Sequence, residues 1–151
     1  MIKLIFTTLL LIAAAATTLA QAPDADALLG VWEPSNGKAR VKVEKLGNKY
    51  FGKIVWLKEP LDAATNLPKV DKNNPDEALR STPLKGFRLL KDFEYTTTNT
   101  WEEGTIYDPE NGNTYKCIIK MKDENTLDIR GYIGISTFGR TDIWKRLVLK
   151  K

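Results

Sequence analysis

Two stretches of alternating residues around Gly47-Asn48 constrain the fold of this 151-residue chain most strongly. Residues 39–46 and 49–58 are rich in β-branched and aromatic residues, and a two-residue Gly-Asn loop between such stretches is typical of a tight β-hairpin. The register set by this loop places six residues on one apolar face, in the pairs Val41–Ile54, Val43–Gly52 and Ala39–Trp56. Because a slip of one residue would expose that whole face, the pattern predicts an antiparallel sheet with one buried side.

The same alternation recurs further along the chain. Residues 113–122 and 126–133 alternate between apolar and polar, and the short loop between them predicts the pairs Met121–Leu127, Ile119–Ile129, Lys120–Asp128 and Cys117–Gly131. Eight such strands follow one another at the short spacing typical of all-β domains. We therefore predict an all-β fold, an eight-stranded antiparallel barrel whose interior is either filled by side chains or holds one small ligand.

The last strand, predicted over residues 140–150, allows two interpretations of its inward face. One places Ile143, Leu147 and Leu149 inside, and the other places Trp144 and Val148 inside. Apolar residues on both sides indicate a strand that is covered on both faces over part of its length.

Residues 1–20 have the pattern of a secretory signal peptide. Lys3 precedes an apolar run, and small residues lead to a cleavage position after Ala20, with Ala22 as the second choice. The alternative, a retained membrane anchor, is disfavoured because the run is short for a membrane span. We therefore expect an exported, periplasmic or secreted protein without stable membrane insertion, with residues 21–151 forming a single barrel domain.

Composition excludes several classes of function. The chain has no histidine and one cysteine, so a cysteine–histidine nucleophile and an internal disulfide are both ruled out. The net charge of +4 is scattered, and no nucleic-acid-binding signature is present. No phosphate loop, dinucleotide fingerprint or Gly-x-Ser-x-Gly motif occurs, so we expect no cofactor, no metal and no nucleic-acid partner.

Residues 59–84 interrupt the β pattern and contain four of the seven prolines. A connection of this length within a compact domain is usually functional or disordered, so we interpret it as a lid or binding loop carrying a short helix. Asn74 is the expected N-cap of that helix, Pro75 its first residue, and Asp71, Asn74 and Asp76 are expected to fix the shape of the loop. A calcium-loop interpretation fails because Pro75 stands at the fifth position and no glycine at the sixth.

Three aromatic residues, Trp56, Trp101 and Tyr115, are predicted to project into the barrel from neighbouring strands. They either line an apolar pocket or simply fill the interior. Glu102 and Glu103 cannot act together as a carboxylate pair, because adjacent strand residues point to opposite faces.

Gly30-Val31-Trp32 resembles the Gly-x-Trp start of lipocalin-type barrels, in which an arginine near the end of the last strand covers the tryptophan ring. The resemblance implies that Arg140 or Arg146 seals the barrel together with Gly30, Trp32 and Trp144. The chain from 28 to 146 also resembles a narrower bacterial family of exported barrels, the domain of unknown function 2147. That resemblance rests on the segments 30–32, 71–76, 83–86, 101–109, 112–115 and 130–146. It implies no established activity and no catalytic residues.

From these features we expect non-catalytic binding of a small apolar or amphipathic ligand in the cell envelope. Trp56, Trp101 and Tyr115 would line the cavity, and residues 59–84 would cover its mouth. A protein-interaction or inhibitor module with a filled barrel and a carboxylate-based hydrolase of envelope glycans are the alternatives.

Overall fold

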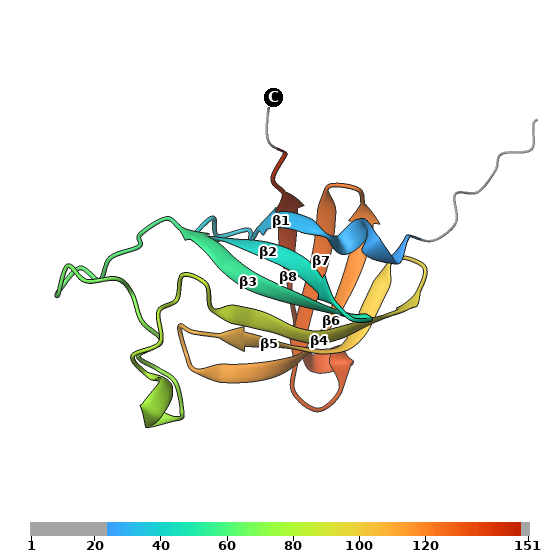
Figure 1. The fold of residues 1–151 in the computed structure, drawn as a ribbon. Helices are drawn as coiled ribbons and strands as arrows, with labels where there is room; N and C mark the ends of the chain where they lie inside the picture. The colour runs from blue at the N-terminus through green and yellow to red at the C-terminus, as the bar shows by residue number, and fades with distance from the viewer. Residues whose placement is uncertain (1–23, 149–151) are drawn as a thin grey trace, which may run out of the picture.

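The structure is a computed structural model that describes residues 24–148 of the chain. It consists of eight strands and three short 3-10 helices, and the strands wrap into one barrel (Figure 1). The strands are β1 (Gly30–Glu33), β2 (Ala39–Leu46), β3 (Lys49–Leu57), β4 (Arg88–Thr97), β5 (Thr100–Asp108), β6 (Asn113–Asp123), β7 (Thr126–Tyr132) and β8 (Arg140–Arg146). The 3-10 helices are η1 (Ala25–Leu28), η2 (Glu77–Leu79) and η3 (Ser136–Phe138).

The strands form a closed barrel in which each pairs with its neighbours in sequence, and β1 pairs with β8 to close the ring. All of these pairings are antiparallel. The predicted eight-stranded antiparallel barrel is therefore confirmed. Closure leaves no unpaired sheet edge along the ring, which removes the site at which exposed strands commonly associate.

Most of the predicted pairings are also confirmed. The hairpin of β2 and β3 pairs Val41 with Ile54 and Val43 with Gly52. The hairpin of β6 and β7 has all four predicted pairs, including Cys117 opposite Gly131. The apolar matches across both hairpins were sufficient to determine these registers, because each places a continuous set of apolar side chains inside the barrel.

The predicted pair Ala39–Trp56 is wrong. A β-bulge between Arg40 and Val41 shifts the register, so that Trp56 lies opposite Arg40 and Leu57 opposite Ala39. One extra residue reverses the direction of the side chains beyond it. Trp56 consequently lies on the outer wall, where it is 37% exposed and its ring lies 4.3 Å from the Arg40 guanidinium carbon.

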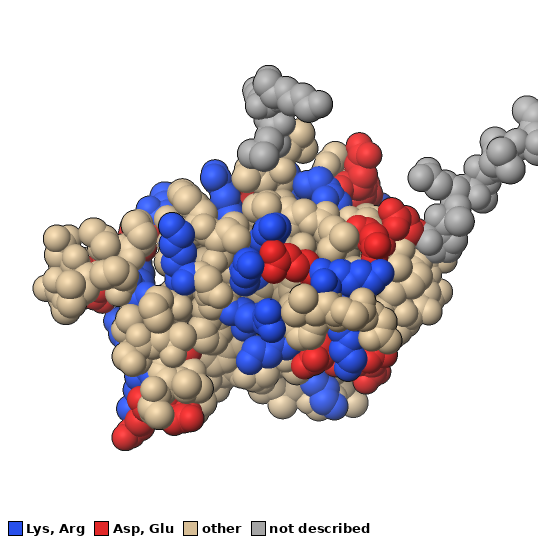
Figure 2. Space-filling model, in the orientation of Figure 1, with Lys and Arg blue, Asp and Glu red and all other residues tan. Residues whose placement is uncertain are grey.

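The outer wall of β2, β3 and β4 is polar. Lys42 and Lys53 lie directly opposite each other, and Glu44 forms ion pairs with both of them. Figure 2 shows lysine and arginine side chains spread over this wall, with acidic side chains between them. Each such exposed pair contributes little to stability, so the apolar interior must hold the barrel together.

One end of the barrel is filled by large side chains. Trp32, Trp101, Tyr50 and Phe93 are fully buried there, and η1 lies across this end of the ring. The indole N–H of Trp101 donates a hydrogen bond to the carbonyl of Ala25 at the start of η1, at 3.1 Å. The helix therefore forms a floor whose backbone is tied directly to the core.

Arg146 joins this floor to the seam between β1 and β8. Its guanidinium carbon lies 4.1 Å from the centre of the Trp32 ring, and its nitrogens donate to the carbonyls of Ala27, Leu29 and Glu124 at 2.7, 2.8 and 2.6 Å. Gly30 has φ +137°, and a Cβ there would overlap the guanidinium. Of the two arginines considered for this position, Arg146 occupies it.

Arg140 lies elsewhere, because it begins β8 and pairs with Gly131 at the opposite end of the barrel. Trp144 is buried and faces the interior, whereas Val148 lies beyond the strand and is exposed. The inward face of β8 is thus the one containing Trp144, although the strand ends before Val148. Leu149 lies outside the described residues. Between residues 24 and 148, no helix has the length and apolar character needed to cross a membrane.

Substitution of Arg146 tests this arrangement. The change Arg146→Ala removes a stacked cation and leaves three carbonyls without their charged donor, so we expect a loss of about 3 kcal/mol in the free energy of unfolding. Urea denaturation measures this loss. Arg140→Ala is the control, and its effect should stay within about 0.5 kcal/mol; equal effects of the two changes would contradict the assigned role of Arg146.

Candidate ligand cavity

The other end of the barrel is hollow. A cavity of about 1710 Å³ extends from the barrel interior to the loops at the ends of β3, β5 and β7. Its inner wall is formed by inward-facing apolar side chains from six strands. They are Val41, Ile54, Leu57, Leu89, Ile106, Ile129 and Trp144. The barrel is therefore filled at one end and open at the other, so the alternatives predicted for its interior each describe one half of it.

Polar groups of the inner wall are satisfied within the protein. The Trp144 indole N–H donates to the Asp142 carboxylate at 2.8 Å, and the other oxygen of that carboxylate accepts from the Ser35 hydroxyl. Pairing of these groups leaves the deeper wall apolar in character. An apolar surface of this kind favours an apolar guest over water.

Of the three aromatic residues predicted to line the cavity, the structure places one there. Tyr115 faces the cavity, and its hydroxyl accepts a hydrogen bond from the Asn111 carboxamide at 3.1 Å. Trp101 lies inside the barrel but in the filled end, where it is fully buried and contacts the rings of Tyr50 and Tyr95 edge to face. Trp56 lies on the outer wall, for the reason given above.

The connection between β3 and β4 is anchored to the barrel by a buried carboxylate. Asp71 is fully buried, and it accepts hydrogen bonds from the Tyr107 hydroxyl at 2.8 Å and from the Asn74 carboxamide at 2.7 Å. Burial, followed by this bond to Asp71, raises the pKa of Tyr107 to about 12. The contact holds the middle of the connection against the end of β5.

The predicted helix in this connection is present but shorter. It covers only Glu77–Leu79, and its N-cap is Asp76, whose carboxylate accepts from the Ala78 N–H. The expectation that Asn74 caps the helix is wrong. Asn74 instead accepts the N–H of Asp76 while donating to Asp71, so its side chain serves the buried anchor.

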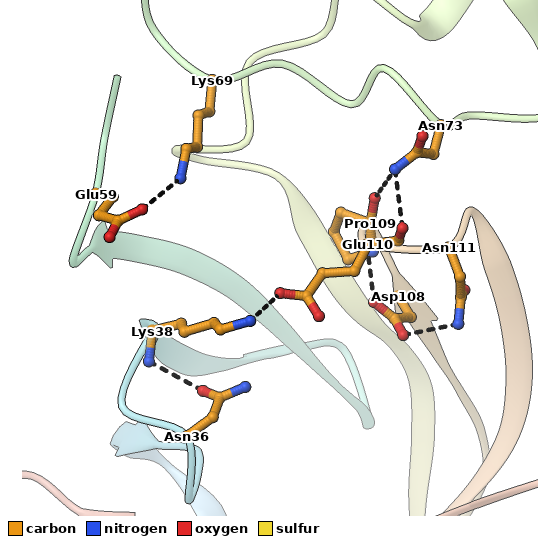
Figure 3. A network of polar contacts seen from close by, with 9 residues as sticks. All are labelled: Asn36, Lys38, Glu59, Lys69, Asn73, Asp108, Pro109, Glu110 and Asn111. Carbon is orange, nitrogen blue, oxygen red and sulfur yellow. Dashed lines mark hydrogen bonds and ion pairs between the residues drawn. The ribbon is translucent and has the colours of Figure 1, made fainter. Parts of the chain in front are cut away.

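A second set of contacts ties the connection to the turn between β5 and β6 (Figure 3). The Asn73 carboxamide donates to the carbonyls of Pro109 and Glu110, each at 2.9 Å. Lys38 forms an ion pair with Glu110, and Lys69 with Glu59. These contacts hold the backbone in place along one side of the cavity mouth.

The other candidate reactive groups lie away from the cavity. Cys117 is buried in the core, and burial raises the pKa of its thiol to about 12. Glu102 accepts from the Thr96 hydroxyl, and Glu103 has a left-handed φ of +61°. Within residues 24–148, no three side chains of histidine, cysteine, aspartate or glutamate gather as a metal site would require. The cavity thus combines an apolar inner wall with polar side chains at its mouth.

Sequence reasoning placed Val41, Ile54 and Ile129 on inward apolar faces, and Trp144 there in one of two alternatives, but it assigned none of them to a cavity. The alternation of β5 and β7 contains a signal for Ile106 and Ile129, whereas Leu57 becomes a wall residue only through the bulge beside it. No pattern in the sequence marks where the filled end stops and the cavity begins.

The family model described as an uncharacterised protein conserved in bacteria, DUF2147, matches residues 30–146. The chain belongs to this family. The matched range runs from the first residue of β1 to the last of β8, so DUF2147 corresponds here to one complete barrel. No curated protein matches the chain in sequence.

Among solved structures, this DUF2147 chain is similar to protein HP1028 from the human pathogen Helicobacter pylori, which is described as belonging to the lipocalin family. The TM-score is 0.69 with 24% sequence identity, and the match covers 81% of this chain and 84% of the other. The similarity shows a lipocalin-like fold. In this chain, one end of the barrel is closed by the stacked Trp32 and Arg146, and the other end holds the cavity.

Removing the hydroxyl of Tyr107 tests the buried anchor. In Tyr107→Phe, Asp71 loses one of its two side-chain donors while remaining buried, so we expect the free energy of local opening for residues 69–82 to fall by about 1.5 kcal/mol. Hydrogen exchange of their amides measures this. Tyr115→Phe, whose hydroxyl bonds to an exposed carboxamide, should leave their exchange unchanged.

The same bond gives a pH dependence with a defined sign. Because the pKa of Tyr107 rises from 10.0 to about 12 on folding, its stabilising contribution is complete below pH 10 and is lost between pH 10 and pH 12. The difference in opening free energy between wild type and Tyr107→Phe should therefore shrink over this range. A difference that stays constant up to pH 12 would contradict the assignment.

Proposed function

We propose that this protein is an exported binding protein, without catalytic activity, that holds a small apolar or amphipathic ligand in the open end of its barrel. The observation that carries the proposal is the cavity of about 1710 Å³ with an inner wall of apolar side chains. Ligand pockets for small molecules typically range from about 300 to 1,000 Å³, so this space is large enough for such a ligand.

The distribution of polar groups supports an amphipathic ligand bound with its apolar part inward. Val41, Ile54 and Ile129 lie deep in the wall, whereas the Tyr115 hydroxyl and the Asn111 carboxamide lie nearer the mouth. A ligand with one polar end would keep that end among hydroxyl, amide and charged groups at the rim. Its apolar part would replace water against the wall, which is the main source of favourable free energy.

The lipocalin-like fold of the Helicobacter pylori protein supports the proposal at the level of architecture only. The alternative of a protein-interaction module required a filled barrel, and the cavity argues against it. The alternative of a carboxylate-based hydrolase has less support than binding, because Glu102 and Glu103 are absent from the cavity wall and the carboxylates that do border the cavity are held in ion pairs or hydrogen bonds within the protein.

Narrowing the cavity should weaken binding. Ile106 faces the cavity and pairs with Tyr115, so Ile106→Trp would occupy space that the ligand needs. We expect at least about a tenfold rise in the dissociation constant for a dansyl-labelled fatty acid, because the indole would fill space and cover apolar wall that the ligand otherwise contacts. Titration of dansyl fluorescence measures the affinity.

Ile118→Trp is the matched control, since Ile118 is on the same sheet but on the outer side of β6. It should bind the labelled fatty acid like the wild type, and circular dichroism should show both variants folded. Leu57→Trp provides a second cavity variant if Ile106→Trp fails to fold. Equal affinity in the cavity variants and the control, or no binding by the wild type together with no copurified ligand in native mass spectrometry, would refute the proposal.

Export is a separate part of the proposal, and it rests on the signal-peptide pattern of residues 1–20. Expression of the full chain in a bacterium, followed by N-terminal sequencing of the protein from the periplasm, should find a chain beginning at Gln21. A protein that stays in the cytoplasm with its first twenty residues intact would show this part to be wrong.

A further inference from the structure

The Tyr115 hydroxyl, which borders the cavity, accepts hydrogen bonds but donates none among the described residues. Its oxygen accepts from the Asn111 carboxamide at 3.1 Å and lies 3.5 Å from the carboxamide nitrogen of Asn113. A phenolic hydroxyl has one proton to donate and lone pairs with which to accept. Because both neighbouring groups are donors, the proton of Tyr115 is left for a partner other than these side chains.

The orientation of the Asn111 carboxamide follows from two of its partners. Its oxygen accepts the backbone N–H of Asn113 at 2.9 Å, and a backbone N–H can only donate. Its nitrogen donates to the Asp108 carboxylate at 2.9 Å (Figure 3), and an ionised carboxylate can only accept. Exchanging the two ends of the carboxamide would set donor against donor and acceptor against acceptor. The second N–H of Asn111 is therefore the one that meets Tyr115, and it makes the hydroxyl oxygen an acceptor.

The turn that holds Asn111 is itself fixed by hydrogen bonds. The Asp108 carboxylate also accepts the N–H of Glu110 at 2.9 Å, and the carbonyl of Asp108 accepts the N–H of Gly112 at 2.8 Å. A series of hydrogen bonds thus runs from the turn between β5 and β6 through Asn111 to Tyr115. The state of the Tyr115 hydroxyl is set by this turn before any ligand arrives.

Tyr115 connects the apolar wall with the mouth of the cavity. It pairs with Ile106, whose side chain belongs to the inner wall, and its hydroxyl reaches the turn at the mouth. A ligand with its apolar part against the wall would place its polar end beside this hydroxyl.

The charged side chains that border the cavity balance one another. They are five carboxylates and five cations, namely Glu59, Asp62, Asp108, Glu110 and Asp142, and Lys38, Lys58, Lys69, Lys72 and Arg140. Neither sign is in excess, and moving an ionised group out of water is costly unless an opposite charge receives it. The mouth therefore gives a charged ligand no general advantage, whereas the Tyr115 proton is available to any acceptor.

Building on the proposed binding function, we propose that Tyr115 determines the specificity of the cavity and that the ligand has an uncharged acceptor oxygen beside its apolar part, such as the carbonyl oxygen of an acyl ester or amide. The Tyr115 O–H donates to that oxygen, and Asn111 keeps the hydroxyl in the donating state. A plain alkane would leave this proton unused.

Displacement of the apolar dye N-phenyl-1-naphthylamine from the purified protein measures the binding of methyl octanoate and of octane. Tyr115→Phe should raise the dissociation constant of methyl octanoate about three- to tenfold, the range expected for one neutral hydrogen bond, and should leave that of octane unchanged. Tyr95→Phe is the matched control, because the Tyr95 hydroxyl is buried without a hydrogen-bond partner in the described part of the chain and lies outside the cavity wall. It should bind both compounds like the wild type.

Asn111→Asp tests the carboxamide as a positioning group. A carboxylate at this place accepts the Tyr115 proton, so the hydroxyl no longer offers it to the ligand. The loss for methyl octanoate should match that of Tyr115→Phe, octane binding should be unchanged, and the double variant should lose no more than either single variant. Additive losses would show that Asn111 does not act through Tyr115 and would overturn its positioning role.

Octanoate tests whether the acceptor is uncharged. It should bind no more tightly than methyl octanoate at low or high salt; an advantage of more than about tenfold that salt abolishes would overturn the assignment of an uncharged oxygen.

Failure of this inference is distinguishable from failure of the proposed function. A wild-type protein that binds neither the dye nor any of the three compounds would refute the proposed function, and the role of Tyr115 with it. A protein that binds the dye and octane, but whose affinity for methyl octanoate is the same in the wild type and in Tyr115→Phe, retains the proposed function and refutes only the role of Tyr115.

Discussion

The stacking of the Arg146 guanidinium on the Trp32 ring is the contact on which the closed barrel depends. The seam between β1 and β8 has only two residue pairs, Trp32–Arg146 and Glu33–Lys145, so backbone pairing there is short. The guanidinium adds hydrogen bonds to the carbonyls of Ala27 in η1, Leu29 just before β1 and Glu124 in the turn between β6 and β7. One side chain thereby links the seam to the floor and covers the Trp32 ring, and Gly30 is needed because a Cβ there would overlap the guanidinium.

A filled floor has a direct consequence for the opposite end. Trp101, Phe93 and Tyr50 use up the interior volume near η1, and they supply the dense packing on which stability depends. Beyond them the inner wall is mainly aliphatic, and the interior is left open as the cavity. The anchor of Asp71, Asn74 and Tyr107 holds the long connection beside the opening, so contacts with the barrel set the shape of the mouth.

Much of this architecture could be predicted because it follows from local patterns. Alternation and turn chemistry determine the pairings of β2 with β3 and of β6 with β7, and they yield Gly131 opposite Cys117. A β-bulge has no comparable pattern in the sequence, because the position of its extra residue depends on the curvature of the closed barrel. That is why Trp56 was placed inside and why Leu57 was not recognised.

The site was predicted less well than the fold, for a related reason. Asn74 has the residue type of an N-cap, but a buried carboxylate needs a donor more than a short helix needs a second cap, and the Asp71 bond prevails. Trp101 was correctly expected inside the barrel, yet the depth at which a side chain lies depends on the packing of all eight strands. Residue spacing within one strand contains no information about that depth.

The central claim is that an apolar ligand binds in the open half of the barrel, and amide chemical-shift mapping tests it most directly. During titration of the isotopically labelled protein with decanoate, the account predicts that the largest shifts occur at Ile54, Ile106, Gly131 and Trp144, which border the cavity. Leu127 and Ile119, buried in the filled half, should hardly move. Shifts confined to the outer wall, or no saturable shifts in the barrel, would contradict the claim.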